Sequence, residues 1–417
     1  MRICFLANVN SKTCQNWISY FLSENKRTQY EVHIISLYPP VGNIQLEGAQ
    51  LHVVSLFDQR GHSVQDLISA TTGSGNSIGK AWAQAKVRGF QLAGQLATRW
   101  WSQVRVLTLR RRVCKVLQEV QPDLVHALRL FQEGEMAGLS DWRPLIISVW
   151  GQDLTIEARL SPLHGWLARN ALSQADAVTA DNKRDLELAF EWGRRLGTTG
   201  ELFLSSGGIR SEIFYPGEPD QTLLQQFVLD TNSLVILSPR GLRPGYIRLS
   251  TLFEAIPKVA RVYPQVRFVQ LEIPNQAIAE SYGLAPASMP FIRLLRRASQ
   301  DVLAELMRGS TLMVSPAIKD GTPNSFFECM ACGVVPIVPN ITPYPEWIKH
   351  GQNGMFFDPY DAEDLARVII QAIDSPLFLE RAREMNLELV SKWAARDSAM
   401  ARAEALYRSV LCHGKIE

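Results

Sequence analysis

The 417-residue chain has few cysteines and no long apolar run. Its six cysteines are scattered along the chain, which argues against a small fold held together by disulfides. No stretch reaches the ~20 consecutive apolar residues that a membrane-spanning helix needs. The apolar start, Met1–Ala7, is too short for the core of a signal peptide. We therefore expect a cytoplasmic protein without a membrane span.

The chain also lacks a strong net charge. Its 43 Lys and Arg nearly balance its 41 Asp and Glu, so a net charge of +2 gives no general attraction to nucleic acid. Residues 67–118 are the local exception, because they contain basic residues and no Asp or Glu. The basic positions are Lys80, Lys86, Arg88, Arg99, Arg105, Arg110, Arg111, Arg112 and Lys115, with four aromatic residues, Trp82, Phe90, Trp100 and Trp101, interleaved.

Two interpretations of this basic segment are open. A basic helix with interleaved aromatics suits an anionic membrane surface, which favours peripheral contact through residues 80–115 at the inner face of the plasma membrane. Alternatively, the basic residues form the solvated face of a helix that packs on its own sheet. Nucleic-acid binding is disfavoured, because no nucleic-acid motif accompanies the charge.

A metal site is not expected. Cys329 and Cys332 form a C-x-x-C pair, but structural zinc takes four ligands and the chain has no second C-x-x-C. Two small side chains packed inside a helix explain the pair better.

The length predicts two domains, since a single core rarely grows to this size. Apolar runs at Ile3–Ala7 and Glu31–Leu37 flank a helical stretch, which is typical of a parallel sheet with a helical crossover. The same alternation returns with Leu234–Ser238 and Val266–Leu271. A glycine pair, Gly207-Gly208, lies between the two series. The predicted division is 1–207, 208–395 and a C-terminal helix over 396–417.

The most informative stretch runs from Ser315 to Val338 and predicts a loop, a helix and a strand. Thr322 suits the N-cap of the helix, and Pro323 suits its first helical position. Apolar residues recur with helical spacing from Phe326 to Ala331. Gly333 fits the position just past the helix end.

The start of this helix predicts a nucleotide-sugar site. The backbone N–H groups of Asn324, Ser325 and Phe326 have no helical partner, and the helix dipole makes them a phosphate site. Asp320 precedes them and Glu328 follows eight residues later. A carboxylate has two acceptor oxygens and can hold neighbouring hydroxyls, as on a ribose.

The whole string, D-G-T-P-N-S-F-F-E-C-M-A-C-G-V-V-P-I-V, resembles the E-x7-E donor-binding signature of the retaining GT-B glycosyltransferases of family 4, the glycosyl transferases group 1. Asp320 replaces the first Glu and keeps its charge with a shorter reach. The resemblance implies an α/β GT-B fold, with two Rossmann-like domains facing a cleft and the last helix crossing back to the first domain. It also implies donor-binding roles for Gly321, Thr322, Pro323, Asn324, Ser325 and Glu328.

Three further segments are similar to those of the family. Relatives place an Arg and, five residues later, a Lys against the donor diphosphate; here these positions are Arg240 and Gly245, and Arg243 is the nearby substitute cation. The segment Q-P-D-L-V-H-A places His126, and W-G-Q-D places Asp153, where the family contacts sugar or acceptor. The resemblance thus implies Asp320, His126 and Asp153 as catalytic residues.

The function implied is transfer of a sugar from a nucleotide-diphosphate donor to an acceptor hydroxyl, with retention and without a metal or a cofactor. A carbohydrate or lipid-linked acceptor, in the synthesis of cell-surface polysaccharide or glycolipid, is the expected partner. Two alternatives stay open. One is a GT-B epimerase or phosphorylase, and the other is a catalytically silent relative that binds nucleotide sugars or a protein partner.

Overall fold

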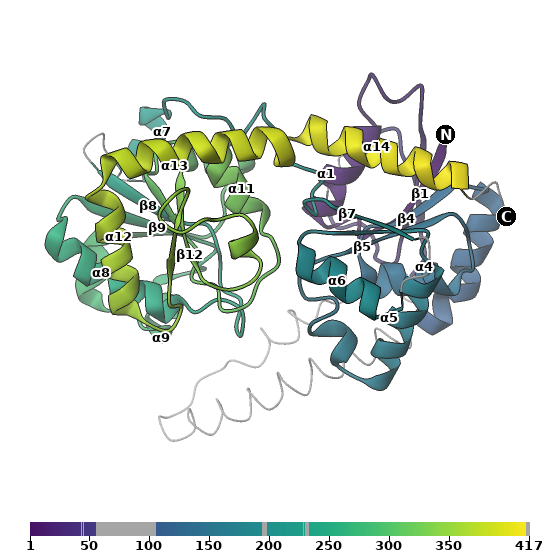
Figure 1. Cartoon of the computed structure of the whole chain (residues 1–417), viewed down its shortest axis with the longest axis horizontal. Helices are drawn as coiled ribbons and strands as arrows, with labels where there is room; N and C mark the ends of the chain where they lie inside the picture. The colour runs from purple at the N-terminus through teal and green to yellow at the C-terminus, as the bar shows by residue number, and fades with distance from the viewer. Residues whose placement is uncertain are drawn as a thin grey trace. The chain divides into compact units, whose positions relative to one another are not determined.

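The computed structural model describes residues 1–42, 44, 46–55, 106–193, 198–227, 229 and 233–413. The chain divides into two compact units (Figure 1). The first contains Met1–Thr179, Leu188–Gly200 and Tyr407–Glu417, and the second contains Ala180–Glu187 and Glu201–Leu406. Residues 201–207, which the sequence assigned to the first domain, thus group with the second unit.

The first unit is built on a seven-stranded sheet with the order β3-β2-β1-β4-β5-β6-β7. Its strands are β1 (Arg2–Leu6), β2 (Glu31–Ser36), β3 (Gln50–Val53), β4 (Leu124–Ala127), β5 (Leu145–Val149), β6 (Ala177–Ala180) and β7 (Thr199–Leu202). The pairings from β3 through β5 are all parallel. Because the order runs outward in both directions from the β1–β4 pair, the switch point where such sheets bind ligands lies between these two strands.

The second unit repeats this design with a six-stranded sheet, ordered β10-β9-β8-β11-β12-β13. Its strands are β8 (Leu234–Ser238), β9 (Val266–Leu271), β10 (Ile292–Leu295), β11 (Leu312–Val314), β12 (Val335–Pro339) and β13 (Met355–Phe357), all paired in parallel. Its switch point lies between β8 and β11.

Helices connect and cover the strands (Figure 1). In the first unit and around its border these are α1 (Lys12–Phe21), η1 (Leu130–Gly134), α4 (Glu135–Leu139), η2 (Glu157–Arg159), α5 (Pro162–Gln174) and α6 (Lys183–Glu191). The others are α7 (Gln221–Gln226), α8 (Leu249–Val262), α9 (Gln276–Ser281), η3 (Pro286–Phe291), α10 (Gln300–Arg308), α11 (Asn324–Ala331), η4 (Tyr344–Glu346), α12 (Ala362–Ile373), α13 (Pro376–Leu389), η5 (Val390–Ala394) and α14 (Arg396–His413). The amphipathic helices α8 and α12 lie side by side (Figure 1) and turn their apolar faces to one core.

The predicted α/β architecture with two parallel sheets is confirmed. The apolar runs at Leu234–Ser238 and Val266–Leu271 are strands with the predicted bounds. The sequence missed β7, whose segment T-G-E-L has only one apolar residue and therefore no strand signal.

The C-terminal helix α14 begins in the second unit, and its residues from Tyr407 onward belong to the first. Tyr407 is fully buried there, and its hydroxyl accepts a hydrogen bond from Trp17 Nε1 at 3.1 Å. The predicted return of the last helix to the first domain is therefore present in the chain.

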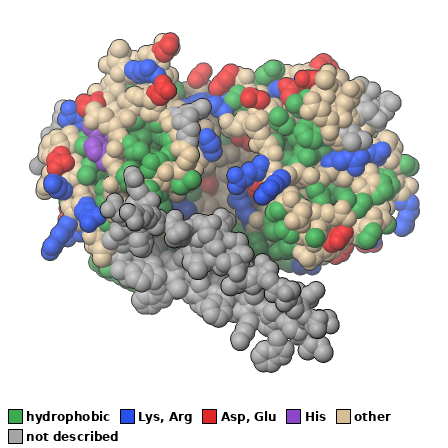
Figure 2. All heavy atoms as spheres, turned by 180° about the vertical axis from the view of Figure 1, so that it is seen from behind, with side chains coloured by type: hydrophobic (Ala, Val, Ile, Leu, Met, Phe, Trp, Pro, Cys, Tyr) green, Lys and Arg blue, Asp and Glu red, His purple; other side chains and the backbone are tan. Residues whose placement is uncertain are grey.

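Most of the basic segment, residues 67–105, lies outside the described residues. Residues 106–120 form a helix that buries Val106, Leu109 and the other members of one face, while its basic side chains are exposed. Arg110 pairs with Asp141 at 3.0 Å, and Arg112 donates to the Ser55 carbonyl at 3.0 Å. This described part has the solvated outer face that the second interpretation predicts. On the face drawn in Figure 2, both acidic and basic side chains lie on the described surface.

Within the described ranges, no helix combines the length and the apolar character needed to span a membrane.

Candidate functional site

The second sheet brings two loops together at its switch point. One follows β8 and carries Arg240 and Arg243, and the other follows β11 and leads into α11. Backbone hydrogen bonds join the two loops: Arg248 N–H donates to the Pro316 carbonyl and Ile318 N–H to the Tyr246 carbonyl, both at 2.7 Å. The sheet therefore holds the predicted phosphate-binding arginines next to the predicted phosphate-binding helix.

The turn after β8 explains the missing lysine. Gly245, which stands at the lysine position of the resembled family, has a φ of +81°, a backbone conformation that L side chains rarely adopt. The Arg243 carbonyl closes this turn by accepting from the N–H groups of Tyr246 and Ile247 at 3.0 and 2.9 Å. A lysine at position 245 would therefore strain the turn.

Helix α11 begins one residue later than predicted. Pro323 is its N-cap with an extended ψ of 136°, and no side chain caps it. The prediction of Thr322 as the N-cap and Pro323 as the first helical residue is wrong. The Thr322 hydroxyl is used elsewhere: it donates to the Asp181 carbonyl at 2.5 Å and accepts from Trp347 Nε1 at 3.4 Å. Gly333, with a φ of +81°, does follow the helix end, and its N–H donates to the Met330 carbonyl.

Two of the three predicted phosphate donors are open. Phe326 N–H donates to the Pro323 carbonyl at 3.2 Å, so its prediction as a free donor is wrong. Within the described residues, the N–H groups of Asn324 and Ser325 have no protein partner, and both residues are partly exposed. The Ser206 hydroxyl donates to Asn324 Oδ1 at 2.9 Å and fixes that side chain. The helix start therefore offers two amides to an anion.

Asp320 and Arg240 pair with each other at this site. Arg240 Nη2 lies 2.8 Å from Asp320 Oδ1, and the Tyr344 hydroxyl lies 3.4 Å from Asp320 Oδ2. Tyr344 is fully buried and also bonds the Ser315 hydroxyl at 2.9 Å. Burial raises the pKa of Asp320, while Arg240 and Arg243 oppose the rise. Both carboxylate oxygens of Asp320 therefore have protein partners. The sequence predicted that this carboxylate contacts the donor sugar, and that contact stays a prediction.

Arg243 is the open cation of the loop. Its side chain is exposed, it has no hydrogen-bond or ion-pair partner among the described residues, and its charge is felt at Asp320. A planar guanidinium pairs well with phosphate oxygens. Arg243 therefore suits the predicted role of the substitute cation.

Glu328 lies one turn inside α11 with an open carboxylate. Burial raises its pKa to about 7, and the positive charge of Arg210 partly offsets this rise. The carboxylate has no hydrogen-bond partner within the described part of the chain. Arg210 in turn donates to the Gln300 side chain at the start of α10. Sequence reasoning missed Arg210 and Gln300, because neither belongs to a recognisable motif.

His126 lies in the core of the first unit. It is fully buried at the end of β4, and both of its ring nitrogens have partners: the Tyr407 hydroxyl at 2.6 Å and the Ser148 hydroxyl at 2.9 Å. Burial lowers its pKa to about 3, which keeps the ring neutral at physiological pH. In this arrangement His126 offers no free atom to a substrate, and its catalytic role stays a prediction.

Both carboxylate oxygens of Asp153 also accept hydrogen bonds from the protein. One oxygen accepts from Arg129 Nε at 2.9 Å, and the other accepts from the N–H groups of Trp150 at 3.1 Å and Leu130 at 3.3 Å. Its carboxylate raises the pKa of Arg129. Asp153 therefore joins the segments that follow β4 and β5. Neither of its carboxylate oxygens is free in this structure for the predicted contact with sugar or acceptor, so that contact stays a prediction.

Two acidic residues near Asp153 gave no signal in the sequence. Glu133 and Glu135 are buried in the segment after β4, at 4% and 2% exposure. Burial raises the pKa of Glu135 to about 8, and a backbone hydrogen bond from Gln132 at 3.1 Å opposes the rise. They lie in the segment that follows β4, at the switch point of the first sheet.

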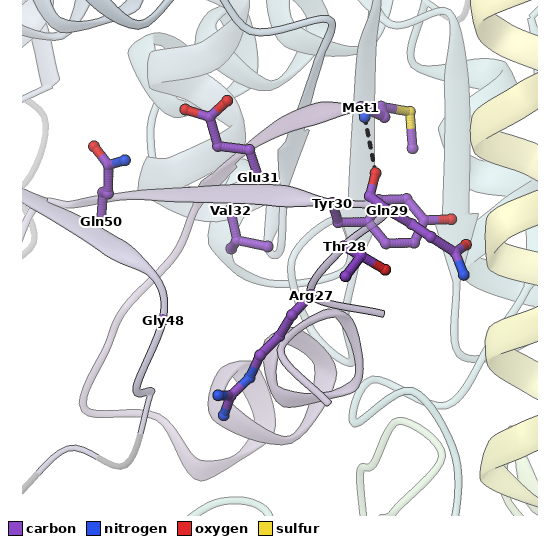
Figure 3. Close-up of a pocket in the computed structure, with 9 residues that line it drawn as sticks. All are labelled: Met1, Arg27, Thr28, Gln29, Tyr30, Glu31, Val32, Gly48 and Gln50. Carbon is purple, nitrogen blue, oxygen red and sulfur yellow. Dashed lines mark hydrogen bonds between the residues drawn. The ribbon is translucent and has the colours of Figure 1, made fainter. Parts of the chain in front are cut away.

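One surface pocket lies at the other end of the first sheet. It has a volume of about 340 Å³ and is formed where β1 and β2 begin, beside the hydrogen bond from the Met1 amino group to the Gln29 carbonyl at 2.8 Å (Figure 3). Its lining residues are Met1, Arg27, Thr28, Gln29, Tyr30, Glu31, Val32, Gly48 and Gln50. Parallel sheets bind ligands at the carboxyl ends of their strands, so this pocket is separate from the candidate site.

In the part of the chain that the structure describes, no group of three or more His, Cys, Asp or Glu is arranged to hold a metal ion. Cys329 and Cys332 are buried free cysteines, as the packing interpretation predicts.

Comparisons with known proteins give a family for part of the chain and a fold for the whole of it. Residues 225–388 match the family described as "Glycosyl transferases group 1". The chain is 28% identical over 245 residues to the serotype-specific mannosyltransferase WbdA of Escherichia coli, an alignment that covers 56% of this chain and 29% of the relative. The chain thus spans under a third of the length of this curated relative.

Solved structures share the fold along the whole chain. Sucrose-phosphate synthase from Thermosynechococcus elongatus aligns with a TM-score of 0.72 and 11% identity, over 99% of this chain and 100% of that one. Anabaena HepE, solved with UDP and glucose, aligns with a TM-score of 0.67 and 17% identity, over 97% and 99% of the two chains. At such identities the likeness shows the fold alone, which is the predicted GT-B fold.

Proposed function

Since residues 225–388 belong to the group 1 glycosyl transferases, we propose that the chain transfers a sugar from a nucleotide-diphosphate donor to an acceptor hydroxyl, with retention. The observation that carries the proposal is the set of open groups at the switch point of the second sheet. Two helix amides, the Arg243 guanidinium and the Glu328 carboxylate are without protein partners within the described residues. They are the donors and acceptors that a diphosphate attached to a ribose requires.

In this proposal the helix start binds the phosphates. The amides of Asn324 and Ser325 donate to phosphate oxygens, and Arg243 adds a full positive charge. When the glycosidic bond breaks, negative charge grows on the leaving diphosphate. Fixed donors aimed at that charge stabilise the transition state more than the ground state.

Glu328 binds the ribose through its two carboxylate oxygens. Asp320 has a supporting role, since its pairing with Arg240 fixes the geometry of the loop and leaves Arg243 to carry the contact with phosphate. The first unit binds the acceptor, which is a carbohydrate or a lipid-linked sugar in polysaccharide synthesis. The mannosyltransferase relative supports transfer of a sugar.

A catalytically silent binding protein is the second candidate. The Arg240–Asp320 pair and the glycine at position 245 favour it, because both reduce the free charge at the diphosphate site. Incubation of the purified protein with a panel of nucleotide sugars and oligosaccharide acceptors separates the candidates. Release of nucleoside diphosphate together with a lengthened acceptor supports transfer. Tight binding with no loss of the sugar identifies the silent protein.

A further inference from the structure

The open groups at the donor site extend beyond the ribose position. Arg210 links Glu328 to the start of α10: its positive charge partly offsets the rise in the Glu328 pKa, and its guanidinium donates to the Gln300 side chain. Gln300 is the first residue of α10 and directly follows the loop after β10. A nucleoside whose ribose is bound by Glu328 therefore places its base against the loops that follow β9 and β10.

These two loops are joined to each other. Ile273 N–H donates to the Leu295 carbonyl at 3.2 Å, which fixes the residue after the end of β9 beside the last residue of β10. Glu272 precedes Ile273, and Arg296 and Arg297 follow Leu295. One acidic and two basic residues thus flank this backbone contact.

Glu272 is held in an unusual position. It has a φ of +57°, a conformation that costs energy for a residue with a side chain and that persists where the surroundings impose it. It packs directly on Gly241, where any side chain would overlap Cβ and Oε2 of Glu272. The residue is nevertheless exposed, and its carboxylate has no partner among the described residues. The absence of a side chain at Gly241 therefore leaves space for the Glu272 carboxylate, which has no partner within the described residues.

Arg296 and Arg297 are also exposed and without partners within the described residues. Guanidinium groups donate to adjacent acceptors, as they do to O6 and N7 of guanine. A carboxylate accepts from two adjacent donors, and guanine alone among the common bases presents two, at N1 and N2. Uracil presents one N–H between two carbonyl oxygens, so a carboxylate would face a repelling oxygen.

We infer that the donor nucleotide of this chain carries guanine, which Glu272 binds at the N1–H and N2 amino groups and the Arg296–Arg297 pair binds at O6 and N7. The inference rests on the proposed donor site. It adds the chemical class of the base, which the phosphate and ribose contacts leave open because every nucleoside diphosphate shares them.

The test compares GDP with IDP, which lacks only the N2 amino group. Isothermal titration of the full chain should give a dissociation constant about tenfold lower for GDP than for IDP, and lower for GDP than for UDP or ADP. In Glu272→Gln the GDP-to-IDP preference should disappear, because the amide presents an N–H where the carboxylate presented an acceptor. In the double variant Arg296→Met, Arg297→Met both GDP and IDP should weaken and their ratio should persist, since they share O6 and N7.

Glu280→Gln is the matched control, because Glu280 is an exposed acid on α9 in the same unit. Its nucleotide constants should equal those of the unaltered chain. Equal binding of GDP and IDP, or a preference that survives Glu272→Gln, overturns the guanine assignment. If UDP binds most tightly and Glu328→Ala weakens that binding, the donor site stands and the base assignment falls. If no nucleoside diphosphate binds, the proposed function itself falls.

Discussion

The two units use the same doubly wound sheet in different ways. In the first unit, the predicted site residues at the switch point are hydrogen-bonded within the protein. His126 and Asp153 are buried, and each has a partner for every polar atom of its side chain. In the second, Arg243 and Glu328 have no partner within the described residues. The difference indicates that the first sheet edge is braced by its polar residues, whereas the second is prepared for a ligand.

The largest effect expected from this comparison is on stability, in the first unit. Asp153→Ala removes three hydrogen bonds and leaves Arg129 without its anion, so the free energy of unfolding should fall by about 3 kcal/mol. Chemical denaturation measures it, and Glu119→Ala, which removes an exposed ion pair with Lys115, should cost under ~1 kcal/mol. Unchanged stability together with lost transfer would show instead that Asp153 is catalytic.

A comparable change in the second unit should act on binding. Glu328→Ala removes the ribose contact and should weaken nucleoside diphosphate binding by about 2 kcal/mol, or roughly 30-fold, with little loss of stability. Calorimetric titration measures the affinity. Glu384→Ala, which alters an exposed acid on α13, should leave it unchanged. A stability loss with unaltered affinity would make Glu328 a structural residue.

Arg243 should have a smaller effect, because the helix amides share the diphosphate with it. Arg243→Met should weaken binding by about 1 kcal/mol and reduce the salt dependence of the affinity. Arg261→Met on α8 is the control, since that basic side chain is exposed and distant in sequence from both loops. If Arg240→Met weakens nucleoside diphosphate binding more than Arg243→Met does, and the two variants are equally stable, then Arg240 and not Arg243 contacts the diphosphate.

The pH dependence of binding should be the smallest effect. The free Glu328 carboxyl has a pKa of about 7, and ribose hydroxyls donate to its ionised form, so affinity should rise as pH rises through 7. Between pH 6.5 and 7.5 the ionised fraction increases about threefold, and the affinity should follow it before levelling off. Because phosphate also titrates in this range, the quantity to measure is the difference from Glu328→Gln. Identical profiles for the two proteins would contradict the assignment.

The sequence predicted the second unit well because its signals are local. Helical spacing placed Phe326, Phe327 and Met330 in the core, and all three are fully buried. Gly333 gave the end of α11 correctly. The start of α11 lies one residue later than predicted, and the Thr322 hydroxyl bonds the Asp181 carbonyl instead, a contact between residues 141 positions apart that no local pattern contains.

The environment of the site residues could not be predicted for the same reason. A motif locates Asp320 and Arg240 in the chain, but their pairing depends on how two loops meet at the ends of β8 and β11. Likewise, His126 carries the expected strand pattern, while its burial depends on Tyr407, 281 positions away. Residue type and spacing therefore gave the position of the site, and the tertiary contacts decide which of its groups are free.

A crystal structure of the chain with a bound nucleoside diphosphate tests the central claim most directly. We expect phosphate oxygens within hydrogen-bond distance of the Asn324 and Ser325 amides, with both ribose hydroxyls on Glu328. A nucleotide bound elsewhere, with those two amides bonded to protein atoms, would contradict the account.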